Sequence, residues 1–174
     1  ESNNVWEFSI APDGGLTPLG SSPSSGENTR SIAMEPTGHY LYAANSGSDS
    51  LGVYAIGNTG QLTLLNSVTT EGGPSTVAVD PSGRWVYVGH YASLNLLTYS
   101  IDATTGLLTP VGSPVRAGSA NQGSNILTVD PSGRFLFSAQ YQTVSSFSIG
   151  ADGRLTALQE IASGPVTGGL TVHP

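Results

Sequence analysis

The sequence predicts an all-β protein built from repeated four-stranded units, and three observations support this prediction. A turn-and-strand motif, "VDPSGRWVYV" at 79–88, returns as "VDPSGRFLF" at 129–137 and, in degraded form, as "MEPTGHYLY" at 34–42. A second motif, Thr/Asp-Gly-x-Leu-Thr, places leucines at 16, 62, 108 and 155, with spacings of 46, 46 and 47 residues. No stretch of ten residues shows a helical period of apolar side chains, so helices are not expected.

The period of the repeat indicates the architecture. Repeats of about 40–50 residues with four short strands each are typical of β-propeller blades. In one repeat the four segments, which we call a, b, c and d, are 76–80, 85–90, 94–101 and 107–111. The sequence therefore predicts a β-propeller of four-stranded antiparallel blades with a repeat of about 46 residues.

Turn chemistry separates these segments. In the Asp-Pro-Ser-Gly turn between a and b, proline sets φ and the aspartate accepts backbone N–H groups. In the Thr-Gly-x-Leu turn between c and d, glycine supplies the positive φ of a hairpin. Segment c alternates in character, as in Val53 and Ala55 against Tyr54 and Ile56, which marks a strand. The aromatic residues after each a–b turn are expected to pack between blades: Tyr40, Tyr42, Trp85, Tyr87, Phe135 and Phe137.

The repeats divide the chain into parts of one propeller domain. We expect strands c and d of a first blade in 1–29, full blades in 30–74, 75–124 and 125–167, and a single strand a in 168–174. Unpaired strand edges at both ends must be covered. Three alternatives follow: the sequence is part of a longer polypeptide, the four blades close on themselves, or chains complete one another by strand exchange, including open filaments.

The cycle "DPSGRFLF", "VSSFSI" and "TGLLTPVGSP" resembles the lactonase-type seven-bladed β-propellers, which include 6-phosphogluconolactonase-like proteins and carboxymuconate cyclases. The resemblance covers essentially the whole chain, which would form about half a ring. It implies a lactone-processing site of His, Glu and Arg residues on the loop face, with a His-x-His-like run before a strand a. Here the comparable stretch is "NQGSN" at 121–125, without histidine. Such a site would therefore lie in other blades, or this member does not hydrolyse lactones.

Composition narrows the range of partners. The chain has 12 acidic residues and five arginines, no lysine, and a net charge of −7. Nucleic acid and anionic membranes are not expected as partners, because no basic cluster is present to displace their counterions. With no cysteine and no His-x-x-x-His spacing, neither a metal nor a cofactor is expected. The acidic, Lys-free and Cys-free composition favours an extracellular or periplasmic location.

The place of a functional site follows from strand direction. The a–b and c–d turns lie on one face of a propeller, and the d–a and b–c connections lie on the other. The first set is uniform and the second varies between blades, so a binding site is expected on the d–a and b–c face near the axis. Candidate catalytic residues there are His90, Arg30 and Arg116, and candidate ligand-binding residues are Tyr91, Gln122 and Tyr141.

Each candidate also has a structural interpretation. His90 can be a buried polar residue at a strand end, and Arg30 can form a surface ion pair with Glu27. The two carboxylates Asp80 and Asp130 fall in equivalent turns, so we expect them to cap turns and not to act on a substrate.

Two main functions remain: an exported binding or assembly module, completed by pairing with itself or with further blades, and a lactone hydrolase. A strand-exchanging filament subunit is a third. The expected ligand in either of the first two is a small lactone or a carbohydrate.

Overall fold

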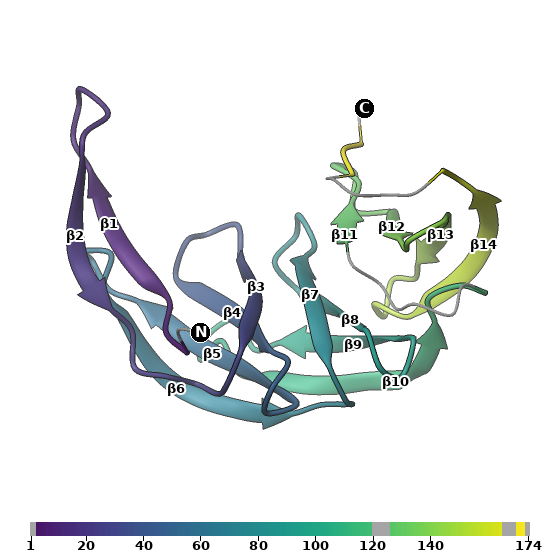
Figure 1. Cartoon of the computed structure of the whole chain (residues 1–174), viewed down its shortest axis with the longest axis horizontal. Coiled ribbons are helices and arrows are strands. Elements are labelled where there is room, and N and C mark those ends of the chain that lie inside the picture. Colours follow the sequence, from purple (N-terminus) through teal and green to yellow (C-terminus); the bar gives the residue numbers. More distant parts are fainter. Residues whose placement is uncertain (1–2, 120–125, 165–169, 173–174) are drawn as a thin grey trace.

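The computed structural model describes residues 3–119, 126–164 and 170–172. Within these residues the chain forms fourteen β-strands and no α-helix. The strands make three four-stranded antiparallel sheets and one two-stranded sheet, which we name the first to fourth blades in chain order (Figure 1). The predicted all-β class with four-stranded propeller blades and a partial first blade is confirmed.

The first blade is a hairpin, and each later blade contains strands a, b, c and d in sheet order. The first blade consists of β1 (Trp6–Ile10) and β2 (Leu16–Ser21). The second consists of β3 (Thr29–Met34), β4 (Tyr40–Asn45), β5 (Ser50–Ile56) and β6 (Leu62–Thr69). The third consists of β7 (Pro74–Val79), β8 (Trp85–His90), β9 (Asn95–Ile101) and β10 (Leu108–Arg116). The fourth consists of β11 (Ile126–Val129), β12 (Phe135–Ala139), β13 (Thr143–Ile149) and β14 (Leu155–Ala162).

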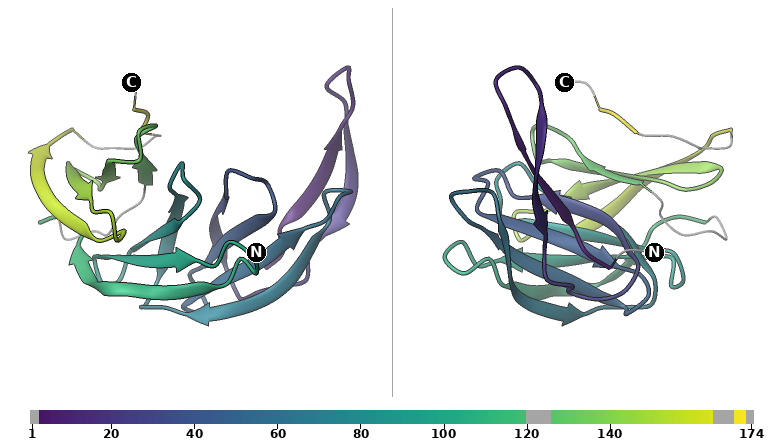
Figure 2. Two further views of the ribbon diagram at one scale, coloured as in Figure 1. Left: turned by 180° about the vertical axis from the view of Figure 1, so that it is seen from behind. Right: turned by 60° about the vertical axis from the view of Figure 1, so that its left-hand side comes forward.

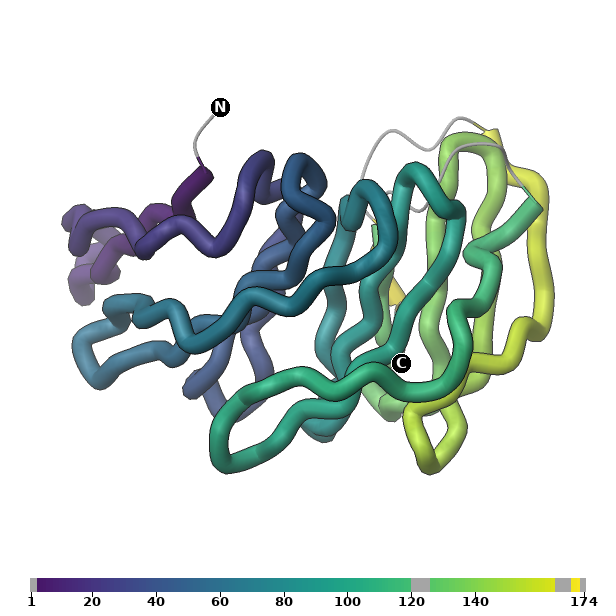
Figure 3. The backbone as a smooth tube through the Cα atoms, turned by 90° about the horizontal axis from the view of Figure 1, so that it is seen from below, coloured from purple at the N-terminus to yellow at the C-terminus, as the bar shows by residue number. Residues whose placement is uncertain are grey.

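The blades follow one another along an open arc (Figures 1 and 3). The three a strands, β3, β7 and β11, lie next to one another on the inner side of the arc. The d strands β6, β10 and β14 run along its outer side, and the β1–β2 hairpin stands at one end (Figure 2). The inner side of the arc therefore corresponds to the axis of a propeller ring.

Two hydrophobic clusters join neighbouring blades, and a smaller one around Leu41, Ala43 and Tyr54 lies within the second blade. Tyr42 and Val53 of the second blade pack with Val86, Val88 and Tyr99 of the third. A matching cluster joins the third blade to the fourth, through Tyr87, Leu96, Leu136 and Phe147. Period-2 alternation along the strands produces this arrangement, because each sheet has one face toward each neighbouring blade.

The a–b turn is held by the carboxylate that the repeat motif supplies. In the third blade, Oδ1 of Asp80 accepts the N–H groups of Arg84 and Trp85, each at 2.8 Å. Its Oδ2 accepts the N–H of Ser82 at 3.0 Å. Asp130 holds the equivalent turn of the fourth blade in the same way. These contacts agree with the capping role expected for the two aspartates, which lie in separate turns.

The degraded copy of the motif uses a glutamate for the same purpose. Oε1 of Glu35 accepts the N–H of His39 at 2.6 Å, and its Oε2 accepts the N–H of Thr37 at 2.6 Å. Burial opposes ionisation of Glu35, but the hydrogen bonds from Thr37, His39 and Tyr40 outweigh it and lower the pKa of this carboxyl. The turn therefore keeps its hydrogen bonds with glutamate in place of aspartate, because the longer side chain reaches the same donors.

The c–d turns of the third and fourth blades each pack on an aromatic side chain of the blade before. A Cβ atom at Gly153 would lie 2.5 Å from Cδ2 of Trp85, and one at Gly106 would overlap the ring of Tyr40. The hydroxyl of Tyr87 donates to the carbonyl of Gly153 at 3.3 Å, and that of Tyr42 donates to Gly106 at 3.1 Å. We call this arrangement the glycine–aromatic contact. Glycine is required for two reasons. A Cβ atom would overlap the ring, and φ is positive, at +71° for Gly106 and +80° for Gly153.

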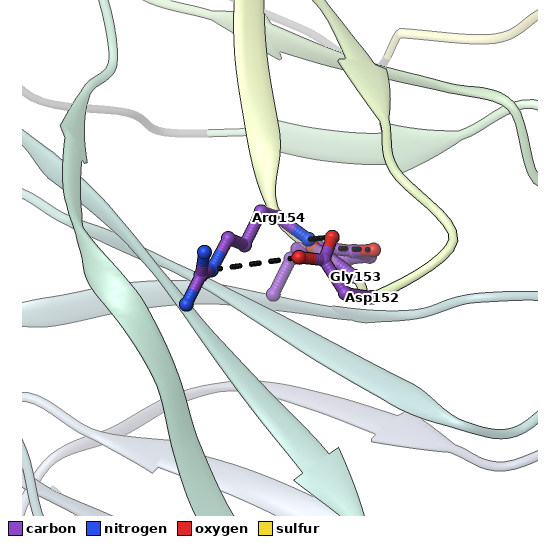
Figure 4. Close-up of polar contacts among 4 residues, drawn as sticks. Asp152, Gly153 and Arg154 are labelled. Carbon is purple, nitrogen blue, oxygen red and sulfur yellow. Dashed lines mark hydrogen bonds and ion pairs between the residues drawn. The ribbon is translucent and has the colours of Figure 1, made fainter.

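Figure 4 shows the turn of the fourth blade that makes this contact. The Nε atom of Arg154 lies 3.6 Å from Oδ2 of Asp152, and its backbone N–H donates to Oδ1 of the same carboxylate at 3.2 Å. Both side chains are exposed, so the ion pair adds little stability. The Arg154 side chain also lies against Gly112 of β10, which extends the contact between the two blades.

Two predicted strands differ from the structure by more than two residues. β10 continues to Arg116 instead of ending at Val111, because a bulge between Val111 and Val115 lets pairing with β9 resume. Of the expected last strand a, 168–174, residues 168–169 and 173–174 lie outside the described residues, and residues 170–172 form no strand. No b strand pairs with residues 170–172, and a strand a depends on that partner for its ladder hydrogen bonds.

The substitution Gly153→Asn should destabilise the protein more than Gly14→Asn. Both glycines have positive φ and asparagine tolerates that conformation, but only Gly153 lies against an aromatic ring, whereas no atom lies within 4 Å of a Cβ at Gly14. The expected difference in the free energy of unfolding is about 1–3 kcal/mol, typical of overpacking. Urea denaturation of the two variants measures it. Equal losses would mean that the close approach of Trp85 contributes nothing.

Candidate functional site

A cleft of about 540 Å³ opens beside the inner strands of the second and third blades. Its walls come from the d–a connections and from the ends of strands a and b, on the face where the connections vary between blades. The lining residues are Asn28, Arg30, Ser46, Gly73, Ser75 and Tyr91. This cleft is the candidate functional site.

Two of these residues are placed by β-bulges at the start of the a strands. In β3, Thr29 pairs with Asn45 and Ser31 pairs with Ala44, so Arg30 is the extra residue of the bulge. The register of β7 skips Ser75 in the same way. A bulge re-aims the side chain of its extra residue. Because both a strands begin with a bulge, Arg30 and Ser75 line one cleft.

Arg30 is exposed and held in place by one hydrogen bond. Its Nε donates to Oγ of Ser46 at 2.9 Å, and Ser46 Oγ donates to the carbonyl of Asn28 at 3.2 Å. Asn28 itself has φ of +55°, which brings its carbonyl to this position. Within the described residues, the two terminal nitrogen atoms of Arg30 have no hydrogen-bond partner and are available to a ligand.

The other side of the cleft combines a tight backbone segment with an exposed ring. Gly73 has φ of +67°, accepts the N–H of Tyr91 at 2.8 Å and donates its own N–H to Asp49 Oδ1 at 2.8 Å. These bonds hold the start of the b–c connection against the d–a connection. The Tyr91 side chain remains 51% exposed, so its ring offers a flat apolar surface beside polar groups.

The lining residues supply donors, hydroxyl groups and an aromatic ring. A guanidinium beside hydroxyl groups and an aromatic face suits a small, oxygen-rich ligand, whether neutral or anionic. The six lining residues include no carboxylate and no imidazole. General acid–base catalysis needs such a group within reach of the reacting atom, so these six residues by themselves favour binding over hydrolysis.

His90 adjoins Tyr91 but takes no part in the cleft. Its side chain is fully buried, with Nε2 2.8 Å from Thr70 Oγ1 and Nδ1 3.3 Å from the carbonyl of Asn95. The Tyr99 hydroxyl donates to the same Thr70 oxygen at 2.9 Å. All these groups are satisfied when Nδ1 carries the proton and Thr70 donates to Nε2. These contacts match the structural interpretation of His90, that of a buried polar residue at a strand end.

Burial lowers the pKa of His90, because a charged imidazole would lose its hydration. The carbonyl of Asn95 and the nearby carboxylates of Glu71 and Asp49 oppose this effect without cancelling it. The neutral imidazole is therefore the stable form in the folded protein near neutral pH.

The remaining candidates from the sequence lie elsewhere. Arg116, at the end of β10, lines a separate cleft of about 170 Å³ with Phe147 and Glu160 of the fourth blade. Tyr141 is exposed in the fourth blade and does not line the 540 Å³ cleft. Gln122 lies outside the described residues. The ion pair expected between Arg30 and Glu27 does not form, because Arg30 donates to Ser46 instead. Within the described residues, the ion pair that is found joins Arg154 and Asp152.

The sequence analysis named Arg30 and Tyr91 as candidates on the same face. It did not single out Asn28, Gly73 or Ser75. Glycine before proline in "EGGPS" was a visible sign of a tight turn at Gly73. Ser75 carried no such sign, because a bulge is defined by pairing register and not by residue type.

Among the described residues, no three His, Asp or Glu side chains gather in a group that could hold a metal ion. In the same part of the chain there is no helix with the length and apolar character needed to cross a membrane.

The fold and the cleft together define a β-propeller with a polar site beside its axis, and comparison with known proteins identifies its family. The model of the family described as lactonase, seven-bladed β-propeller, matches residues 1–124. Because this match covers more than half of the chain, the protein belongs to the lactonase seven-bladed β-propeller family. A search of curated proteins found no match.

Solved structures agree with this fold. A protein from Lactobacillus plantarum is 26% identical with a TM-score of 0.82, and the alignment covers 92% of this chain and 51% of that one. The periplasmic gluconolactonase of Pseudomonas aeruginosa is 19% identical with a TM-score of 0.78, covering 91% and 50%. A Bacteroides uniformis protein proposed to be a 6-phosphogluconolactonase is 16% identical with a TM-score of 0.83, covering 94% and 50%. The chain thus spans about half the length of these proteins.

The pH dependence of stability should report the buried His90. The unfolded chain binds a proton at this residue below a pKa of about 6.5, whereas the folded protein resists it until lower pH. The contribution of His90 to stability is therefore present above pH about 6.5 and is lost as the pH falls. Urea denaturation between pH 5 and 7.5 should show a steeper loss in the wild type than in His90→Asn, which copies Asn45 in the second blade. Parallel curves would contradict this account.

Proposed function

We propose that this chain is the ligand-binding part of a lactonase-type propeller, and that its cleft beside the axis holds a small lactone or carbohydrate. The observation that carries this proposal is the convergence of Arg30, Ser46, Ser75 and Tyr91 in one cleft on the face of the variable connections. Loops that vary over a uniform scaffold are where binding sites usually lie.

The chemistry of the cleft supports a ligand of this class. The free terminal nitrogens of Arg30 can donate two hydrogen bonds to a carboxylate or a ring carbonyl, and such charge-assisted bonds are the strong ones. The hydroxyls of Ser46 and Ser75 lie around a sugar-sized volume, and the exposed face of Tyr91 can cover an apolar ring surface.

A second candidate function is hydrolysis of a lactone. It is favoured by family membership and by the Pseudomonas aeruginosa neighbour, which is a gluconolactonase. The six described lining residues include no acid–base group, so this function requires a carboxylate or imidazole from another source, such as further blades. Lactone hydrolysis assayed with the isolated chain and with a complete ring separates the two functions.

We also propose that other blades complete the ring, either from further polypeptide or from a second chain. Two observations support this: within the described residues β1 pairs with β2 alone, and the solved relatives are about twice as long. A strand-exchanging filament is the open-ended form of the same pairing. The native mass in solution, measured against the 17.8 kDa of one chain, tests these alternatives. It distinguishes a monomer, a discrete dimer and a series of filaments of increasing length.

An extracellular or periplasmic location is part of the proposal. It is supported by the composition, with no lysine or cysteine, and by the periplasmic location of one neighbour. Cell fractionation of the natural host with an antibody against the chain tests it, and a purely cytoplasmic signal would overturn it.

Arg30→Met should weaken ligand binding, because the donors to a carboxylate are removed while the aliphatic bulk remains. We expect the Kd for D-gluconate, measured by calorimetry or NMR titration, to rise by about tenfold or more, which corresponds to one charge-assisted hydrogen bond. Glucono-1,5-lactone, measured before it hydrolyses, should show a smaller change because it is neutral.

The matched control is Arg116→Met. Arg116 is also an exposed arginine at the end of a strand, but it lies in the separate cleft of the third and fourth blades. Binding should be unchanged in this variant. If Arg30→Met binds gluconate as tightly as Arg116→Met, the ligand does not occupy the cleft described here.

A further inference from the structure

We propose that the cleft between the third and fourth blades is a second ligand site, which binds neighbouring hydroxyl groups of a neutral polyol and places one of them between the buried side chains of Gln140 and Ser145. This cleft is separate from the one that contains Arg30, and its ligand does not depend on the function proposed above.

The cleft lies where the d strand of the third blade meets the fourth blade. β10 and β14 are neighbours here, at the end of the arc away from the β1–β2 hairpin (Figure 1). Arg116 and Gly118 line one side of the cleft, and Ser145, Phe147 and Glu160 line the other. Its volume of about 170 Å³ is roughly the liquid volume of five or six water molecules, so it suits a compact ligand.

Two buried polar groups at this cleft have no hydrogen-bond partner among the described residues. Gln140 is fully buried and Ser145 is 3% exposed. The side-chain oxygen of Gln140 accepts the hydroxyl of Thr143 at 3.2 Å, but its amino nitrogen Nε2 has no partner, and neither has Oγ of Ser145. Burial without a hydrogen bond is costly for polar groups, so such groups in a native protein mark the place of a missing partner.

The equivalent positions of the second and third blades show what that partner is. Asn45, His90 and Gln140 each stand nine residues after the proline of their a–b turn. Asn45 Nδ2 donates to Oγ of Ser25 at 3.0 Å, and His90 Nε2 lies 2.8 Å from Oγ1 of Thr70. In both blades the partner is therefore a hydroxyl group from the incoming d–a connection. Gln140 has no such hydroxyl partner within the described residues.

Gly118, in the d–a connection into the fourth blade, leaves this place open to the cleft. A Cβ atom at Gly118 would lie 2.8 Å from Oγ of Ser145 and 3.2 Å from Nε2 of Gln140. Any side chain at this position would therefore fill the space between the cleft and the two polar groups. With glycine, a ligand hydroxyl has room to accept the N–H of Gln140 and to share a hydrogen bond with Ser145.

The remaining lining residues select a neutral ligand. Arg116 and Glu160 both line the cleft but do not pair with each other. Glu160 accepts the N–H of Ser119 at 3.0 and 3.1 Å, which ties the d–a connection to β14. Its carboxylate disfavours an anion such as gluconate, whereas a hydroxyl donates to a carboxylate and accepts from a guanidinium. Leu158, the extra residue of a bulge in β14, offers an apolar wall to the carbon skeleton.

The experiment is an NMR titration of the 174-residue protein with erythritol, a small neutral polyol, and separately with methyl α-D-glucopyranoside. We expect saturable shift changes at Gly118, Ser145 and the side-chain amide of Gln140, and none at Arg30 or Gly73. Binding of erythritol identifies a free polyol as the ligand. Binding of the glucoside alone identifies the hydroxylated edge of a sugar.

Ser145→Ala separates a binding role from a structural one. It should raise the Kd for the probe by about fivefold, which corresponds to the loss of one hydrogen bond. Without ligand, the same variant should resist urea at least as well as the wild type, because an unsatisfied buried hydroxyl is removed. Ser148→Ala, on the same strand but outside the cleft, is the matched control and should bind as the wild type does.

A reciprocal pair of variants distinguishes the two clefts. Arg116→Met should weaken binding of the neutral probe and leave gluconate binding unchanged, and Arg30→Met should do the opposite. If neither probe shows saturable binding, ordered water alone occupies the place and the inference is overturned. Equal binding by the wild type and Ser145→Ala overturns it as well.

The outcome is separable from that of the proposed function. Arg30-dependent binding of gluconate without polyol binding removes the second site and leaves the first in place. Polyol binding without gluconate binding does the reverse.

Discussion

The glycine–aromatic contact is the interaction on which the arrangement of the blades depends. A propeller blade is a small sheet that cannot bury its faces alone, so the way one blade sits on the next determines whether a core exists. Here the c–d turns of the third and fourth blades approach the preceding b strand so closely that Gly106 and Gly153 have no room for a Cβ atom. Tyrosine hydroxyls bonded to the carbonyls of Gly106 and Gly153 then fix the position of the turn along the ring.

The inner strands gain their geometry from this stacking. Once neighbouring blades are fixed, β3 and β7 lie side by side, and the bulge at the start of each brings its extra residue into a common space. The cleft thus combines side chains from two blades, Arg30 with Ser75 and Tyr91. A polar site of this kind is a product of how blades pack, whereas the a–b turns lie on the opposite face and are held by their own carboxylates.

Family membership and local chemistry bear on function at different levels. The lactonase match describes a scaffold, because the residues of the repeat are turns and core positions. The cleft adds the local chemistry: among the described residues its lining consists of binding groups without an acid–base group. Buried His90 illustrates the difference: a titratable residue in the right column of the repeat serves the hydrogen bonds of its own blade.

The strands, the turns and the blade repeat could be predicted from the sequence, because these depend on short-range signals. Proline and aspartate in the a–b turn, glycine in the c–d turn and period-2 alternation act within a few residues of one another. The sequence also placed Arg30 and Tyr91 on the d–a and b–c face. The packing of the blades was needed to show that these two share a cleft, that Ser75 joins them through a bulge, and that His90 is buried against Thr70. Those outcomes depend on pairing register and on the approach of one blade to the next, which join residues twenty to sixty-six positions apart in the chain.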